Sequence, residues 1–291
     1  MIKVLKIVYA ILNSAIIISL LIIHFGLKES TYQNSIRFYT FPLPVIIGVV
    51  LFLTIFLARK FRKYNVWLII VLLLLWLSRS FKIHFSEEIK ASDIEIVFWN
   101  ASHDKGFEDA FNLNEGIPDV LVLVEARRSN IEKLQLEYPD YFFYQSVKKL
   151  FIFSKTPLHN ITEEAFKFGT IVINFETANI NFYAIDAMGS IDVPKSWGFK
   201  FIDSKIDNSE TSIILGDFNV PFESKYLDKI KKDFNHAFNE KGNGFRETWF
   251  WNLPILSLDH IWVSKDLKVL KTKKFYSKVS DHCMIKTYVR K

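Results

Sequence analysis

Three long apolar runs occupy the first 81 residues of the chain. The stretches 7–23 and 41–57 contain no charged residue, and 66–77 is almost purely aliphatic. A helix needs about 20 residues to cross the hydrocarbon core of a bilayer, with a working range of about 17–25. The first two runs reach this length, whereas the third reaches it only when its flanks are included. The pattern predicts three transmembrane helices that anchor the chain in a lipid bilayer, at about residues 4–25, 41–58 and 64–81.

The charge of the chain is unevenly distributed and indicates an orientation for these helices. The formal net charge is +6, but nine Lys or Arg and one acid fall within residues 1–79, which leaves −2 for residues 80–291. The basic residues concentrate before the first run and between the second and third runs, at Lys3, Lys6, Arg59, Lys60, Arg62 and Lys63. Because cytoplasmic loops are rich in Lys and Arg, we expect a multi-pass protein of the plasma (inner) membrane with an extracytoplasmic C-terminal domain. If the third run does not span the membrane, that domain lies on the cytoplasmic side instead.

Short apolar runs separated by turns follow from residue 91 onwards. Their composition predicts strands at 94–99, 120–124, 150–153, 171–175, 180–185, 212–215, 258–263 and 283–289. Helical spacing of apolar residues predicts helices at 131–138, 197–206 and 224–232. Alternating strands and helices over this length indicate one α+β domain, residues 91–291, with an ample core. The single cysteine of the chain, Cys283, excludes an intrachain disulfide framework.

Polar side chains stand at the ends of five of these strands. Each of them alone is an ordinary loop or turn residue. Carboxylates and carboxamides at strand ends along one rim of a sheet, however, can direct their oxygen atoms towards one point. In chain order these side chains are Asn100, Glu125, Asp217, Asn219, Asp259, Asp281 and His282.

The order and wording of these segments resemble the endonuclease/exonuclease/phosphatase superfamily. The matching segments are 98–100, 118–125, 216–219, 258–261 and 280–282. Three apolar runs before such a domain resemble a bacterial membrane-anchored subgroup, in which a Gly-rich turn followed by Thr-Trp, here 242–249, often precedes the aspartate strand. The resemblance implies a four-layer α/β/β/α sandwich preceded by three transmembrane helices. It also implies a membrane-anchored, metal-dependent phosphoesterase that cleaves a phosphodiester or a phosphomonoester.

The resemblance further implies a metal site. Glu125 would be the principal ligand of Mg²⁺ or Mn²⁺, with Asn100 and Asp281 beside it. Carboxylate and carboxamide oxygens together with retained waters suit these hard cations better than zinc. A cation held there would polarise a phosphoryl oxygen and stabilise the leaving oxyanion.

Four further residues have implied roles in the chemistry. His282 and Asp259 would act as a pair, in which the carboxylate orients and charges the imidazole near the phosphate. Asp217 would position or deprotonate the attacking water, and Asn219 would donate a hydrogen bond to the developing phosphorane oxygens.

One position departs from the family pattern. After the strand at 180–185 the family usually places a histidine that contacts the phosphate, and this chain has Asp186. A carboxylate that faces a phosphate is unfavourable unless a metal lies between them or the carboxyl is protonated. Asp186 is therefore an added metal ligand or the sign of an altered or inactive enzyme, which leaves a membrane-bound binding module as the alternative function. His103 and His159 could substitute for the missing histidine, or be loop histidines without such a role.

The substrate class stays open between nucleic acid, a phospholipid headgroup and a small phosphate ester such as a sugar phosphate. The clearest basic cluster of the domain is the lysine run at 265–278. These lysines alternate with apolar residues, which is typical of the solvated face of a strand or hairpin rather than of a nucleic-acid interface. No pattern in the sequence indicates the oligomeric state.

Overall fold

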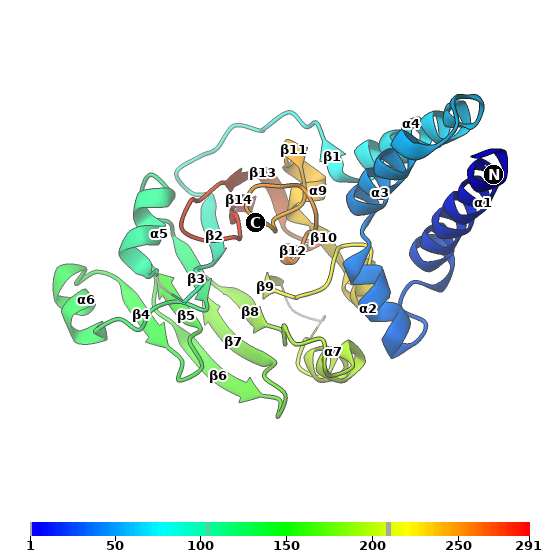
Figure 1. Ribbon diagram of the computed structural model, residues 1–291. Helices are drawn as coiled ribbons and strands as arrows, with labels where there is room; N and C mark the ends of the chain where they lie inside the picture. The colour runs from blue at the N-terminus through cyan, green and yellow to red at the C-terminus, as the bar shows by residue number, and fades with distance from the viewer. Residues whose placement is uncertain (1, 104, 208–210) are drawn as a thin grey trace. The chain divides into compact units, whose positions relative to one another are not determined.

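The chain forms two compact units, of which the first ends at Phe81 and the second begins at Lys82 (Figure 1). The structure, a computed structural model, describes residues 2–103, 105–207 and 211–291. The first unit is helical and contains α1 (Ile2–Leu21), the π-helical turn η1 (Ile22–Leu27), α2 (Tyr32–Thr40), α3 (Leu43–Phe56) and α4 (Arg59–Ser80).

Two of these helices are long and apolar enough to cross a membrane. They are α1 continued by η1, and α4, which has 22 residues. The second apolar run forms only the 14-residue helix α3, which meets the same test together with α2 as a pair bent by 66°. The part of the chain that the structure describes therefore offers two candidate spans, or three if the bent pair is one. The third run, expected to be marginal, instead gives one of the two long helices, because α4 begins at Arg59 and includes the basic segment.

Polar contacts inside the helical unit fix the directions of its helices. The Asn65 side-chain amide donates to Asn13 Oδ1 at 3.2 Å and to Thr54 Oγ1 at 3.0 Å. The Tyr9 hydroxyl donates to the Leu53 carbonyl at 2.8 Å. These contacts bring the first half of α1 and the start of α4 to the end of α3. The helix α3 therefore runs antiparallel to both, as a middle span does, and such interhelical hydrogen bonds contribute about 0.6–2 kcal/mol each in a membrane.

The second unit contains two six-stranded sheets. The first sheet has the order β13-β14-β2-β3-β5-β4 and the second β10-β12-β9-β8-β7-β6. The strands of the first sheet are β2 (Ile94–Asn100), β3 (Val120–Val124), β4 (Phe142–Gln145), β5 (Phe151–Ser154), β13 (Lys268–Phe275) and β14 (Met284–Arg290). Those of the second sheet are β6 (His159–Ala165), β7 (Ile171–Thr177), β8 (Ile180–Asp186), β9 (Ser212–Asp217), β10 (Phe234–His236) and β12 (Asp259–Ser264). Two short strands, β1 (Phe81–Lys82) and β11 (Gly244–Phe245), lie outside these sheets.

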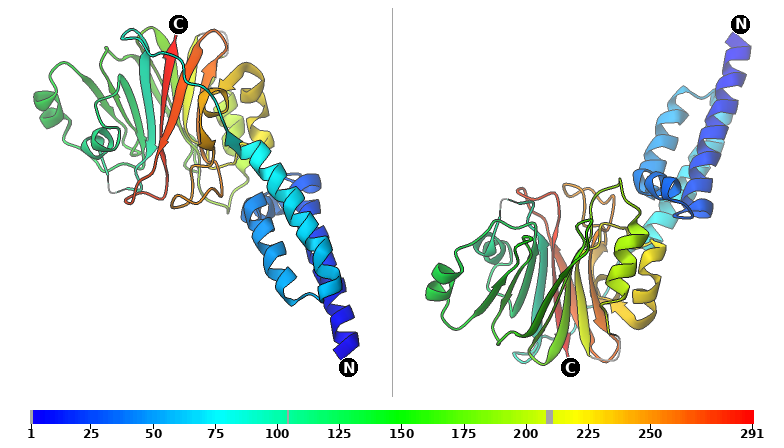
Figure 2. Two further views of the ribbon diagram at one scale, coloured as in Figure 1. Left: turned by 90° about the horizontal axis from the view of Figure 1, so that it is seen from above. Right: turned by 90° about the horizontal axis from the view of Figure 1, so that it is seen from below.

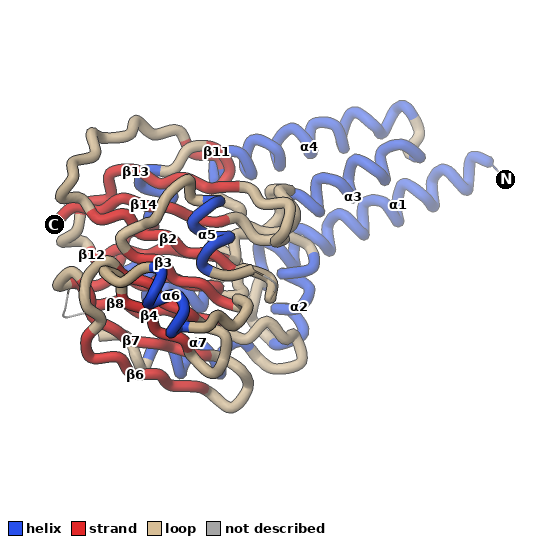
Figure 3. The backbone as a smooth tube through the Cα atoms, turned by 90° about the vertical axis from the view of Figure 1, so that its left-hand side faces the viewer, coloured by secondary structure: helices blue, strands red, loops and turns tan. Residues whose placement is uncertain are grey.

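The two sheets stack face to face, and helices cover their outer faces (Figure 2). The strands run side by side, with α5 (Phe107–Leu113) and α6 (Ile131–Glu137) on the outside of the first sheet (Figure 3). On the other side lie α7 (Lys195–Asp203), η2 (Lys225–Leu227), α8 (Asp228–Asp233) and α9 (Ala237–Lys241). The expected four-layer α/β/β/α sandwich is therefore confirmed.

Two apolar layers hold the sandwich together. Phe98 and Val122 of the first sheet pack with Phe182 and Ile213 of the second in one fully buried cluster. On the opposite face of the first sheet, Trp99 and its neighbours pack beneath α5 and α6 in another. Because β3 and the second half of β2 are buried on both faces, the segments 96–99 and 120–124 are continuous apolar runs rather than alternating patterns.

Candidate active site

The first sheet brings four of the expected residues to one edge. The strands β2 and β3 are parallel, and Asn100 lies opposite Val124. Asn100 and Glu125, the residue after Val124, therefore lie at the same end of the sheet. The strand β14 is antiparallel to β2 and begins at this end, directly after Asp281 and His282. Glu125 has a φ of 51°, in the left-handed region that non-glycine residues seldom adopt and that is frequent at functional sites.

The second sheet brings its own acidic residues to the same edge. The strands β8 and β9 are parallel, with Asp186 opposite Asp217, and β12 is antiparallel to β9 and starts with Asp259 opposite Asp217. Gly216 allows this pairing, because a Cβ atom at this position would overlap the carbonyl group of Ile185 on β8. The alternation of parallel and antiparallel neighbours thus collects the strand ends of both sheets at one place.

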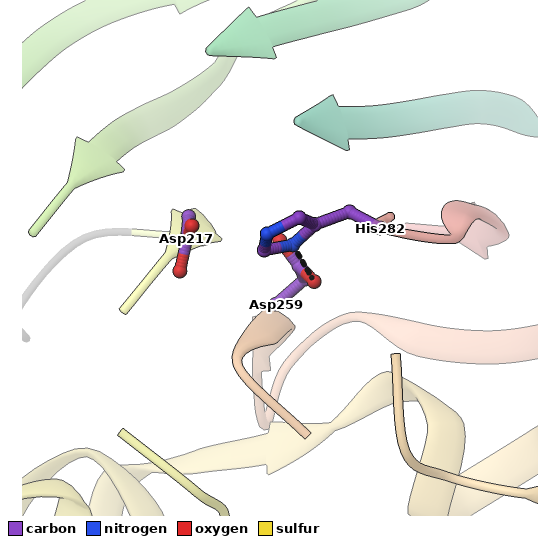
Figure 4. Close-up of side chains that lie close together, drawn as sticks. All are labelled: Asp217, Asp259 and His282. Atoms are coloured by element: carbon purple, nitrogen blue, oxygen red, sulfur yellow. Dashed lines mark hydrogen bonds and ion pairs between the residues drawn. The ribbon is translucent and has the colours of Figure 1, made fainter. Parts of the chain in front are cut away.

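A buried cluster of three side chains forms the centre of this edge (Figure 4). His282 Nδ1 lies 2.8 Å from Asp259 Oδ2, and one potential ligand atom of each of Asp217, Asp259 and His282 lies within 4.8 Å of the others. Burial alone would lower the pKa of His282, but the carboxylates of Asp259 and then Asp217 outweigh it and raise this pKa to about 10. The imidazole is therefore positively charged at neutral pH and donates its Nδ1 proton to Asp259.

Asp217 is fully buried and accepts two hydrogen bonds. The backbone N–H of Asn219 donates to its Oδ1 at 2.8 Å, and the side-chain amide of Asn100 donates to its Oδ2 at 3.0 Å. Burial and the neighbouring Asp259 raise the pKa of Asp217 to about 7, against the opposing effect of His282. A carboxylate with this pKa can accept a proton from water near neutral pH.

Asn219 lies at the same edge in a constrained conformation. Its φ is 51°, and its side-chain amide donates to the Ala187 carbonyl at 2.7 Å. The buried His260 supports this loop, because its Nε2 lies 3.2 Å from the carbonyl oxygen of Val220, the residue after Asn219. Burial lowers the pKa of His260 to about 4, so its imidazole is neutral and can donate this hydrogen bond.

Two side-chain donors hold the carboxylate of Asp281, one of them from the Thr-Trp pair and the other from the loop after β2. The Ser102 hydroxyl donates to Asp281 Oδ1, and the Trp249 indole N–H donates to Asp281 Oδ2, each at 2.8 Å. Burial raises the pKa of Asp281, but these hydrogen bonds outweigh it, so the net pKa lies below its usual range. Thr248 Oγ1 accepts from the backbone N–H of Asp259 at 3.1 Å. The Thr-Trp pair that precedes the aspartate strand therefore positions one acid through each of its members, and its place in the sequence was the available signal.

The other acidic strand end, Asp186, lies near Asp217 and Glu125. Burial, followed by these two carboxylates, raises the pKa of Asp186 well above its usual range. This shift favours the uncharged, protonated form of the carboxyl group. A protonated carboxyl is one of the two conditions under which an aspartate can face a phosphate.

The two histidines considered as substitutes lie in different places. His103 Nε2 is 3.1 Å from Glu125 Oε2, so it contacts the expected metal ligand. His159 opens β6 opposite Glu176, whereas the end of β6 at Ala165 pairs with Ile171 next to Asp186. His159 therefore lies at the far edge of the sheet, and the idea that it replaces the missing histidine is wrong.

Lys195 is a site residue that the sequence did not reveal. It opens α7, is only 6% exposed, and its Nζ donates to the Met188 carbonyl, two residues after Asp186. Burial lowers the pKa of Lys195 to about 8, although Asp217 acts in the opposite direction. No described carboxylate lies within ion-pair distance of its ammonium group. Nothing in the sequence distinguishes this lysine from the exposed ones.

The side chains at this edge fit a hard divalent cation. Asn100, Glu125 and Asp281 offer side-chain oxygen atoms from three neighbouring segments of the first sheet, and Asp217 and Asp259 offer carboxylates from the second. Among the described residues, the buried Asp259 Oδ1 has no hydrogen-bond partner. A buried carboxylate oxygen without a donor is costly unless a proton or a cation satisfies it.

Two stacked sheets with acids, carboxamides and a charged histidine at one edge are typical of enzymes that hydrolyse phosphoesters. The sequence profile of the Endonuclease/Exonuclease/phosphatase family matches residues 97–282. The chain belongs to this family, and the resemblance noted in the sequence is confirmed. A search of curated proteins finds no matching relative.

Solved structures of low sequence identity share the fold. An AP endonuclease from Archaeoglobus fulgidus is 13% identical, with a TM-score of 0.54, over 67% of this chain and 98% of that chain. A mannosyl-6-phosphatase from Bacteroides thetaiotaomicron is 14% identical, with a TM-score of 0.52, over 68% of this chain and 100% of that chain. A family protein from Leptotrichia buccalis is 15% identical, with a TM-score of 0.51 over the same shares. At these identities the similarities establish the fold alone.

Proposed function

We propose that the chain is a membrane-anchored phosphoesterase that depends on Mg²⁺ or Mn²⁺ and hydrolyses a phosphodiester or a phosphomonoester. The observation that carries this proposal is the buried cluster of Asp217, Asp259 and His282. Hydrolysis requires a group that takes a proton from water and a positive charge near the phosphate. In this cluster an acid with a pKa of about 7 lies beside an imidazolium group.

Glu125, Asn100 and Asp281 would hold the cation, which when bound would polarise a phosphoryl oxygen and stabilise the leaving oxygen. Asp217 would accept one proton from a water molecule as the water oxygen forms its bond to phosphorus. The ester P–O bond breaks, and the leaving oxygen takes a proton from solvent. The imidazolium of His282, held by Asp259, and the Asn219 amide would donate hydrogen bonds to the phosphoryl oxygens. Asp186 would act there as a neutral hydrogen-bond donor or as an added ligand.

We further propose that residues 1–80 form the membrane anchor and residues 91–291 the catalytic domain. Basic residues stand at the starts of α1 and α4, and the contacts around Asn65 support a common end for both helices. With three spans, the positive-inside rule favours the plasma (inner) membrane and an extracytoplasmic catalytic domain. If α2 and α3 form a re-entrant pair rather than a span, the domain lies on the cytoplasmic side.

The full chain purified in detergent tests the activity. Hydrolysis of bis-p-nitrophenyl phosphate and of p-nitrophenyl phosphate is measured with Mg²⁺, with Mn²⁺ and with EDTA. His282→Ala should lower kcat by about 100-fold or more, which is the usual contribution of such a group. His159→Ala, which removes a histidine at the far edge, is the matched control and should leave kcat unchanged. Equal activity of the two variants, or activity that survives EDTA, would contradict the assignment.

The alternative function is a binding module without catalysis, and Asp186 in place of the family histidine is the observation in its favour. A wild-type chain that binds Mn²⁺ in a calorimetric titration but hydrolyses neither ester would support this alternative. Activity that is restored by Asp186→His would assign the loss to this position.

A further inference from the structure

Exposed apolar side chains of the second unit gather on loops at the active edge. They lie after β4, after β8, at the start of α7, between β11 and β12, and after β13: Val147, Ile191, Trp197, Phe250, Trp251, Leu253, Tyr276 and Val279. The other large apolar side chains of this unit that are exposed, within the residues described, are Ile83, Phe85, Ile89, Leu136 and Phe142. We call the first set the apolar rim.

Backbone contacts place the apolar rim beside the site. The backbone N–H of Trp251 donates to the Asp281 carbonyl at 3.0 Å. On the other side, a Cβ atom built on Gly189 would lie 3.5 Å from Asn219 Oδ1, and Ile191 follows two residues later. The rim therefore flanks the acidic cluster on at least two sides, whereas the side chains at the centre are polar and buried.

An apolar rim around a polar site has a physical cost in water. Clusters of exposed large apolar side chains are rare on soluble domains and indicate an interaction surface. Trp and Tyr, of which this rim has three, are the residues that favour the headgroup level of a bilayer. A water-soluble phosphate ester needs no such surface to reach the site.

The connection to the first unit indicates what covers the rim. The candidate span α4 ends at Ser80, and the second unit begins at Lys82. One residue of chain spans less than about 4 Å, so the domain is tethered directly at the surface of any bilayer that α4 crosses. Tethering makes contact with this bilayer effectively intramolecular, so a modest apolar surface is sufficient for stable docking.

We propose that the apolar rim inserts into the bilayer that holds the N-terminal helices, and that the phosphoester cleaved at this site belongs to a membrane lipid. This inference rests on the proposed phosphoesterase activity. Interfacial apolar surfaces are buried about 5–10 Å deep, at the boundary between headgroups and acyl chains. Insertion of the rim would turn the edge that holds Asp217, Asp259 and His282 towards the lipid headgroups.

Insertion is tested on the full chain reconstituted in phosphatidylethanolamine and phosphatidylglycerol vesicles. Leu253→Cys and Phe142→Cys are each labelled with the fluorophore NBD, and the buried Cys283 does not compete for the label. Leu253 is 56% exposed on the rim, and Phe142 is 39% exposed opposite Ser154 at the far edge of the first sheet. Lipids brominated on the acyl chains should quench the label at position 253 and leave the label at 142 unchanged. Equal quenching at both positions, or none at 253, overturns insertion.

The lipid substrate is tested with two esters that share one reaction centre. Hexadecyl p-nitrophenyl phosphate is embedded in the vesicles, and methyl p-nitrophenyl phosphate is soluble. We expect kcat/KM to be at least tenfold higher for the embedded ester, and Ile191→Ser with Leu253→Ser to remove this preference without changing hydrolysis of the methyl ester. Hydrolysis of both esters at equal rates overturns the lipid substrate and leaves the phosphoesterase intact. Hydrolysis of neither ester overturns the lipid diester substrate, and if p-nitrophenyl phosphate is not cleaved either, it also overturns the proposed function; in both cases the quenching still decides on insertion.

Discussion

Replacement of Asp217 by Asn should stabilise the cation-free protein at alkaline pH while it abolishes hydrolysis. The carboxylate of Asp217 is buried, and Asp259 lies next to it. Its folded pKa is about 7, compared with 3.8 for the unfolded chain. Above pH 7 the folded state must therefore hold an unfavourable negative charge that the unfolded chain carries in water at no cost.

The size of this effect follows from the difference in pKa. An acid whose folded pKa is raised loses stability as the pH rises from its unfolded pKa to its folded pKa, and the loss is complete above the latter. Three pKa units at about 1.4 kcal/mol each give an upper limit of about 4 kcal/mol. The carboxamide of the Asp217→Asn variant accepts only one of the two hydrogen bonds that Asn219 and Asn100 donate, which costs about 1 kcal/mol. We expect a net gain of about 1–3 kcal/mol at pH 8.

The stability of this unit alone can be read from Cys283. It is the only cysteine of the chain and is buried in the second unit. Its alkylation in increasing denaturant, with the full chain in detergent and EDTA, reports the free energy of unfolding of that unit. The gain should shrink as the pH falls and reverse near pH 4, where the lost hydrogen bond remains and the charge penalty does not. A variant that is less stable by the same amount at pH 4 and pH 8 would refute the reasoning.

Two further predictions concern residues to which the sequence assigned no role. Trp249→Phe removes the indole donor from Asp281 Oδ2 but keeps an aromatic ring. The affinity for Mn²⁺, measured in a calorimetric titration, should therefore fall about tenfold or more, with little change in stability. Unchanged affinity would mean that Asp281 is not a ligand. Lys195→Met removes a buried ammonium whose pKa is lowered to about 8 from 10.5, a penalty that is present below pH 8 and disappears as the pH rises to 10.5. At pH 7 this variant should be more stable by up to about 3 kcal/mol and at least tenfold less active on bis-p-nitrophenyl phosphate. Lower stability with full activity would instead assign Lys195 to holding the Met188 carbonyl.

Residues at the ends of buried strands could be located from the sequence because the strands themselves were continuous apolar runs. Asn100 is the last residue of β2 and Glu125 directly follows β3, and the buried apolar residues before them give a strong local signal. The edge strand β6 and the short helix α5 were not predicted, because β6 is largely exposed and polar and α5 has only seven residues. The predicted helix boundaries in the first unit were also inaccurate. The expected span at 41–58 contains only the 14-residue helix α3, because the backbone becomes extended at Leu57.

The partners of the site residues could not be predicted from local patterns. Trp249 reaches Asp281 across 32 positions and Ser102 reaches it across 179, and only the packed sheets bring these pairs together. The burial that raises the pKa values of Asp186 and Asp217 likewise depends on the whole fold. The sequence marked the Thr-Trp segment but not its role, which follows from the hydrogen bonds of Trp249 with Asp281 and of Thr248 with Asp259.

The central hydrogen bond of the site joins two separate sheets. His282 precedes β14 in the first sheet and Asp259 opens β12 in the second, and the bond from Asn100 to Asp217 crosses the same boundary. Each of these two bonds needs a residue from each sheet, so the candidate site exists only where the two sheets meet. A distant substitution that shifts one sheet relative to the other, for example in the stacked pair Phe175 and Phe182, would therefore abolish hydrolysis. It would do so although every polar residue of the site is unchanged. The rate of hydrolysis should therefore report how accurately the two sheets pack against each other.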